Sequence, residues 1–198
     1  MAFPQSERRK LWKHACLFHL KIYVGHEEDD PHLFRTLVDS WYGYERGEEF
    51  LTRKSGRPKW FNRRELANHR NKLRSMMPWI SLKAMELIER NSAEPVKDWL
   101  VKDHAIPLDS LRKIIRGIAD VSIESIEAAL REYYHIGIIT SDEHARLNKK
   151  LKKDMPDHWK VGHNPYERYR VAGIRRYEGP LPEADLEGLI VKIPATEA

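Results

Sequence analysis

Apolar residues recur at helical spacing near the start of the chain. Four of them lie four, three and four positions apart, which is the pattern of one helix face and predicts a helix over about residues 7–24. They are Leu11, Ala15, Phe18 and Ile22.

A second helix is predicted after the polar stretch that ends this pattern. Asp30 followed by Pro31 has the form of an N-cap with proline at the first helical position. The apolar stripe of this helix consists of Leu33, Phe34, Leu37, Val38 and Trp41.

A third helix is predicted over residues 62–77. Asn62 can cap it, Glu65 stands three positions later, and Phe61 can pack against Leu66 as a hydrophobic staple. The pattern is interrupted at Pro78.

Further helices follow in close succession. The patterns predict one in residues 79–91, one capped by Ser92 and running to about His104, and a short one in 108–117. Ser122 caps a longer helix that we expect to stop at Gly137, and Val121 can staple onto Ile126. The last is introduced by a capping box, which pairs Thr140 with Glu143.

The chain changes character after residue 156, where proline, glycine and tyrosine become frequent. Helical pattern remains only around residues 165–173, and residues 188–194 and 48–52 are the best strand candidates. We therefore predict a mainly α protein. A compact bundle of about seven or eight helices in residues 1–156 carries an extended, basic and aromatic C-terminal arm, residues 157–198, packed on it.

Composition is that of a globular protein of 198 residues, with 41% hydrophobic and 33% charged side chains. No apolar run reaches the roughly 18 residues of a membrane span, so no membrane partner is expected. The one cysteine, Cys16, cannot form an internal disulfide, and a reducing, cytoplasmic location is predicted.

Positive charge is concentrated in two islands. Residues 53–74 carry a net charge of +8 and residues 149–176 a net charge of +6, whereas the rest of the chain is slightly acidic. This distribution favours a polyanionic partner such as DNA or RNA. The alternative is that both islands are only solvated surfaces.

The first island combines a Gly/Pro-containing basic loop, an aromatic pair and an arginine-rich helix face. Because guanidinium groups match the geometry of phosphate oxygens, this arrangement indicates a phosphate grip. The predicted contacts are Lys54, Arg57, Lys59, Trp60, Arg63, Arg70 and Arg74.

One pair in the first island points to another chemistry. The spacing of Arg64 and His69, an arginine and a histidine separated by four residues, resembles the RNase motif of the HEPN family. The resemblance covers residues 64–69 and implies a histidine acting as general acid or base, with the arginine stabilising the phosphorane. Glu65 departs from the family's usual polar residue. A packed histidine on the apolar side of the helix is the alternative.

The second island interleaves basic and aromatic residues, which also suits phosphate backbones. We expect contacts from Lys149, Lys150, Lys152, Lys153, Arg168 and Arg170. An arm that packs Trp159 and its tyrosines on the bundle is compatible with this role.

Two other site types are disfavoured. His14, Cys16, His19 and His26 are not spaced to converge on a metal, and no metal is expected. A helix-turn-helix around Gly117 is disfavoured because its second helix presents mainly glutamates.

The sequence therefore predicts a non-enzymatic accessory or regulatory protein that binds nucleic acid through phosphates and needs no cofactor. Two alternatives remain. One is an adaptor that binds a protein partner through the helices of residues 75–148, and the other is an RNase that uses Arg64 and His69.

Overall fold

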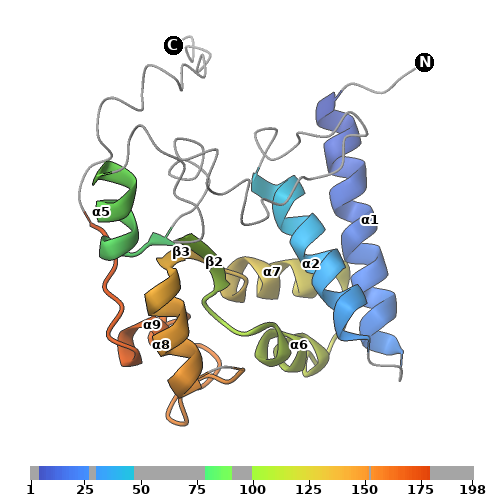
Figure 1. Ribbon diagram of the computed structural model, residues 1–198. Coiled ribbons are helices and arrows are strands. Elements are labelled where there is room, and N and C mark those ends of the chain that lie inside the picture. The colour runs from blue at the N-terminus through green and yellow to red at the C-terminus, as the bar shows by residue number, and fades with distance from the viewer. Residues whose placement is uncertain (1–4, 27–29, 47–78, 91–99, 152, 179–198) are drawn as a thin grey trace, which may run out of the picture.

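The computed structural model describes residues 5–26, 30–46, 79–90, 100–151 and 153–178 of the chain (Figure 1). This part contains seven helices and three short strands. The helices are α1 (Gln5–Gly25), α2 (Pro31–Arg46), α5 (Leu82–Arg90), α6 (Leu108–Arg116), α7 (Ile123–Tyr133), α8 (Ser141–Leu151) and α9 (Glu167–Val171). The strands are β1 (Trp79–Ile80), β2 (Leu100–His104) and β3 (Ile136–Thr140). None of the described helices has the length and hydrophobicity to cross a lipid bilayer.

The strands form one small sheet in the order β1-β3-β2. β1 is parallel to β3, with Trp79 beside Gly137, and β2 is antiparallel to β3, with Asp103 also beside Gly137. Gly137 therefore lies at the centre of the sheet, between a tryptophan and an aspartate.

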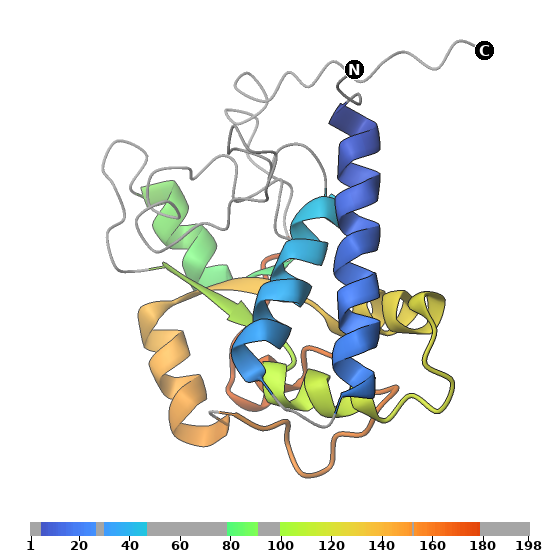
Figure 2. The same ribbon diagram turned by 90° about the vertical axis from the view of Figure 1, so that its right-hand side faces the viewer.

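Helices cover both faces of this sheet. α1 and α2 lie side by side on one side of the molecule, and α8 and α9 lie on the other (Figures 1 and 2). The alternation of side chains along each strand divides the core accordingly. Ile80, Leu100 and Ile138 belong to the larger cluster with α1, α2, α6 and α7, whereas Val101 and Ile139 belong to a smaller cluster with α8 and α9.

The mainly α class is confirmed, but the sequence analysis did not predict the three-stranded sheet formed by β1, β3 and β2. Residues 100–104 form β2, not the end of a helix capped by Ser92. Residues 79–80 form β1 before α5 begins. Gly137 is not a helix stop, since α7 ends at Tyr133 and Gly137 lies within β3. The third predicted helix and both strand candidates lie outside the described residues.

The predicted helix caps are confirmed where the structure describes them. The Asp30 carboxylate accepts hydrogen bonds from the backbone N–H groups of His32 and Leu33, at 2.8 and 3.1 Å. The Ser122 hydroxyl accepts one from the Ser125 N–H at 3.0 Å. These caps satisfy first-turn donors of α2 and α7 that have no partner inside the helix.

A linked pair of caps joins the sheet to α5 and α8. The backbone N–H of Thr140 donates to the Glu143 carboxylate at 3.0 Å, and the Glu143 N–H donates back to the Thr140 hydroxyl at 3.2 Å, as the predicted capping box requires. The Ser81 hydroxyl donates to the same carboxylate and accepts from the Ala84 N–H in the first turn of α5. The buried Glu143 carboxylate thus accepts hydrogen bonds at both junctions, where β1 leads into α5 and where β3 leads into α8.

The α1 helix forms as predicted, but the apolar stripe that indicated it is not the side that faces the core. Its buried side chains are Cys16, Leu17, Leu20 and Tyr23. Leu11, Phe18 and Ile22 of the predicted stripe are 55%, 50% and 48% exposed. Helix α1 therefore has an apolar side toward the core and a second one toward solvent.

Two aromatic rings lie directly on the backbone of Gly137. A Cβ atom at this position would lie 2.9 Å from the Trp79 ring and 3.0 Å from the Tyr169 hydroxyl oxygen. These distances are shorter than van der Waals contact, so the centre of the sheet accepts only glycine unless the rings move.

We expect Gly137→Ala to lower the free energy of unfolding by about 1–3 kcal/mol, because the added methyl group overpacks the buried contact with Trp79 and Tyr169. Urea denaturation followed by circular dichroism measures the change. Gly25→Ala is the matched control, since nothing lies within 4 Å of a Cβ there. Equal stability of both variants would show that the two rings yield without cost.

Candidate nucleic-acid interface

The first basic island lies outside the described residues. Its predicted phosphate contacts are Lys54, Arg57, Lys59, Trp60, Arg63, Arg70 and Arg74, and all of them stay predictions. The same holds for Arg64 and His69, the pair that resembles an RNase motif.

The structure describes almost all of the second basic island, whose predicted contacts are either exposed or buried. Lys149 and Lys150 are exposed in the last turn of α8, and Lys153 is exposed just after it. Lys152 lies outside the described residues. The arginines of α9 lie nearby, because α8 and α9 contact each other.

Arg168 does not belong to the exposed group, which corrects the sequence interpretation. Its side chain is buried, and the residue is 2% exposed. The guanidinium donates to the backbone carbonyls of His104 and Leu151, at 2.8 Å each, and lies 3.5 Å from the Asp103 carboxylate. A cation beside the last carbonyls of α8 stabilises the end of that helix. Arg168 therefore ties α9 to α8 and β2.

Arg170 is exposed, as expected, but a carboxylate orients it. Its guanidinium donates two hydrogen bonds to Glu167, and His158 contacts the same carboxylate at 2.7 Å. The hydrogen bonds from Arg170 and then from His158 lower the pKa of Glu167 to about 2. The bidentate geometry holds the Arg170 side chain in one orientation at the surface.

An open hollow of about 580 Å³ lies beside α9, between β1 and the segment that follows α9. Trp79, Tyr166 and Tyr169 form part of its lining. The rings of Trp79 and Tyr166 are stacked, with centroids 5.8 Å apart and planes 15° from parallel, and Trp79 and Tyr169 are 4.4 Å apart. The Tyr169 hydroxyl donates to Asp103 at 3.1 Å, and burial together with that carboxylate raises the pKa of Tyr169 well above its usual value.

Charged side chains complete this lining. Arg170, Arg175 and Arg176 contribute three guanidinium groups to the lining and Glu178 contributes one carboxylate, while Arg170 is also paired with the carboxylate of Glu167. Backbone pairing holds Arg175 and Arg176 beside the junction of β1 and α5, since the Leu82 N–H donates to the Arg175 carbonyl and Ser81 bridges to Arg176. The result is a rigid aromatic wall with an excess of arginine, a composition that suits the oxygens of a phosphate group.

A second cluster of charged groups lies on the opposite face of β2. Asp39 of α2 accepts a hydrogen bond from the Tyr134 hydroxyl, and its carboxylate lies 3.5 Å from the His104 ring and 3.8 Å from the Lys102 ammonium. Burial alone would raise the pKa of Asp39, but His104 and Lys102 outweigh it and lower that pKa to about 2. Burial lowers the pKa of Lys102. These groups lock α2 onto β2 and the end of α7.

We expect Asp39→Asn to lower the free energy of unfolding by about 2 kcal/mol near neutral pH, because the variant removes the charge that His104 and Lys102 stabilise. A carboxylate with a lowered pKa contributes stability above its unfolded value of 3.8 and loses it as the pH falls toward 2. The difference between wild type and variant should therefore shrink between pH 4 and pH 2 in urea denaturation.

Asp109→Asn is the matched control for that experiment. Asp109 also pairs with an arginine, Arg112 at 3.3 Å, but its side chain is 44% exposed, so we expect a change below about 1 kcal/mol. A difference for Asp39→Asn that stayed constant down to pH 2 would show that the amide disturbs packing and that the charge contributes nothing.

Several residues that define these two sites were missed in the sequence. The apolar pattern predicts a helix at Trp79, and the Asp39 cluster carries no motif, since its members are far apart along the chain. One signal was available: a glycine inside the apolar run of residues 136–140 indicates a strand with close backbone approach.

Comparison with protein-family models, with curated proteins and with solved structures finds no match to this chain. Within the described ranges, no group of three or more potential metal ligands lies together. The interpretation of the surface therefore depends on its chemistry alone.

Proposed function

We propose that this protein binds the phosphate backbone of a nucleic acid, DNA or RNA, as an accessory or regulatory protein. The surface that carries the proposal is the hollow beside α9, where Arg170, Arg175 and Arg176 surround a wall of stacked aromatic rings. The supporting observation is this combination of a fixed shape with an excess of positive charge.

The wall around the hollow is stiff because its parts are buried or bonded on their inner side. Trp79 and Tyr169 are 3% and 1% exposed, and they rest on the backbone of Gly137. Arg170 is held by Glu167. A surface of this kind binds phosphates with little loss of side-chain entropy on association.

The lysines of α8 extend the positive surface beyond the hollow. Lys149, Lys150 and Lys153 are exposed, and Arg168 fixes the end of α8 against α9 from below the surface. Lysine ammonium groups attract phosphates without a fixed geometry, so they suit a sequence-independent role. The first basic island would supply phosphate contacts of its own through its predicted residues.

Binding through phosphates makes a definite prediction about salt. Nuclease-treated protein should bind mixed-sequence single-stranded or double-stranded oligonucleotides with an affinity that falls steeply as salt rises, because bound counterions are released. The double variant Arg175→Glu, Arg176→Glu should weaken binding by roughly tenfold or more and flatten the dependence on salt. Fluorescence anisotropy over a salt series measures both quantities.

The matched control is the double variant Lys113→Glu, Lys160→Glu. It changes the net charge by the same amount at two exposed positions that do not line the hollow beside α9. We expect it to weaken binding much less. Equal losses in both variants would show that only the total charge matters, and a wild-type affinity independent of salt would contradict the proposal itself.

A further inference from the structure

The hollow beside α9 is lined by a flat apolar wall as well as by guanidinium groups. The side chains of Trp79, Tyr166 and Tyr169 form this wall, and Leu82 and Ile174 lie beside them. A phosphate group on its own gains nothing from such a wall, because its oxygens need hydrogen-bond donors and positive charge. A nucleic acid also carries flat apolar surfaces, the faces of its bases, and these are what an aromatic wall binds.

Tyr166 is the ring of this wall that a ligand can reach. Trp79 and Tyr169 are 3% and 1% exposed, whereas Tyr166 is half-buried. Trp79 is the register partner of Gly137, and His135 precedes Gly137 by two positions, so the side chains of Trp79 and His135 lie on the same face of the sheet. The Tyr166 ring packs on both, with its centroid 5.8 Å from Trp79 and 5.3 Å from His135. The side of the ring away from the sheet therefore remains for a ligand in the hollow.

Exposed guanidinium groups lie beside these rings. Arg175 and Arg176 are exposed, and Arg170 is exposed and held by Glu167. Since the sugar joins base and phosphate in a nucleotide, a base against Tyr166 brings its own phosphates to the neighbouring side chains. The hollow of about 580 Å³ also lies within the range of about 300–1,000 Å³ that is typical of sites for small molecules.

We propose that the hollow beside α9 binds one unstacked base of a single-stranded DNA or RNA, with the base against Tyr166 and the adjoining phosphates on Arg175 and Arg176. This inference rests on the proposed function and names the class of nucleic acid. Within a duplex the bases are stacked and paired with one another, so only phosphates reach the guanidinium groups. The protein therefore prefers single strands to duplexes.

Two polar groups in the lining also favour a base over a phosphate alone. The Glu178 carboxylate would repel a phosphate oxygen, but it can accept a hydrogen bond from the amino group of a base. The side-chain oxygen of Asn164 accepts a hydrogen bond from the Tyr166 backbone N–H at 3.0 Å, which fixes this amide next to the ring. Both groups suit the polar edge of a base.

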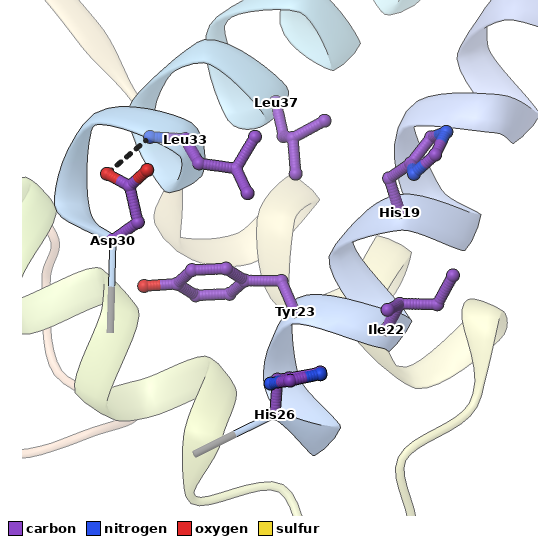
Figure 3. Close-up of a pocket in the computed structure, with 7 residues that line it drawn as sticks. All are labelled: His19, Ile22, Tyr23, His26, Asp30, Leu33 and Leu37. Atoms are coloured by element: carbon purple, nitrogen blue, oxygen red, sulfur yellow. Dashed lines mark hydrogen bonds between the residues drawn. The ribbon is translucent and has the colours of Figure 1, made fainter. Parts of the chain in front are cut away.

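The hollow between α1 and α2 has a different lining (Figure 3). It measures about 270 Å³, and the described residues that line it include no arginine or lysine. Its aromatic ring, Tyr23, is 4% exposed and lies under the Arg116 guanidinium, 5.0 Å from the ring centroid. The Asp30 carboxylate in this lining already caps α2. This hollow therefore lacks the combination of charge and accessible ring that lies beside α9.

Ligands that differ only in their bases test the inference on the unaltered protein. The nuclease-treated full chain is titrated in fluorescence anisotropy with a mixed-sequence DNA single strand, with the same strand carrying abasic sites in place of its bases, and with the duplex. We expect the intact strand to bind at least about tenfold more tightly than the abasic strand, and more tightly than the duplex, because one base stacks on Tyr166. An RNA strand of the same sequence identifies which of the two nucleic acids is the tighter ligand.

Variants of the ring then test where the base binds. Tyr166→Leu should reduce the preference for the intact over the abasic strand by roughly tenfold, whereas Tyr166→Phe, which keeps the ring, should retain it. Trp12→Leu is the matched control, since Trp12 is an aromatic residue that is 46% exposed and does not line this hollow. Thermal midpoints show that each variant is folded. A strand with 5-iodouracil should crosslink to Tyr166 on irradiation, as peptide mass spectrometry detects.

The outcomes separate this inference from the proposed function. Equal affinity for intact and abasic strands, with a steep dependence on salt, would overturn the unstacked base and leave phosphate binding in place. A preference that a folded Tyr166→Leu variant retains, or a crosslink that forms only at another residue, would overturn the site. If none of these ligands bound to the protein, the proposed function itself would be wrong.

Discussion

The contact between Gly137 and the rings of Trp79 and Tyr169 is the constraint on which the smaller core depends. A strand buried on both faces needs apolar cover from two sides, and here one side of the central residue is covered so closely that a Cβ atom would lie 2.9 Å from the Trp79 ring. Any side chain at this position would push the two rings apart. The stack of Trp79, Tyr169 and Tyr166 exists because the backbone leaves room for it.

The same contact connects the core to the surface. The Tyr169 hydroxyl donates a hydrogen bond to Asp103 of β2, and Asp103 pairs with Arg168. The Arg168 guanidinium in turn donates to the Leu151 carbonyl at the end of α8. Arg170 of α9 and Tyr166 at its N-cap lie farther out, and the contacts of Tyr169 and Arg168 fix their positions. A buried arginine and an exposed arginine two positions apart thus have different surroundings: Arg168 fixes the geometry of α9, and Arg170 lies at the surface in the proposed binding site.

Charged side chains on β2 show how the short sheet holds separate helices together. Lys102 and His104 point to one face and meet Asp39 of α2, whereas Asp103 points to the other and meets α9. Because side chains alternate between the two faces along β2, this five-residue strand carries one ionic cluster on each face of the sheet.

The sequence by itself determined the local features of this protein. The helical period of α1, the caps at Asp30 and Ser122, the box of Thr140 and Glu143, and the short helix α9 were all readable, because each depends on residues within a few positions of one another. The second basic island was readable for the same reason.

Tertiary structure alone decided the rest. The strand at residues 100–104 forms because β3 lies beside it, and no local signal distinguishes its residues from a helix. Arg168 is buried because three acceptors from distant segments converge on it. The period of α1 could not tell which of its two apolar sides would meet α2 and α7, since both satisfy the same spacing. Only the packing of helices far apart in the chain left Leu11, Phe18 and Ile22 facing outward.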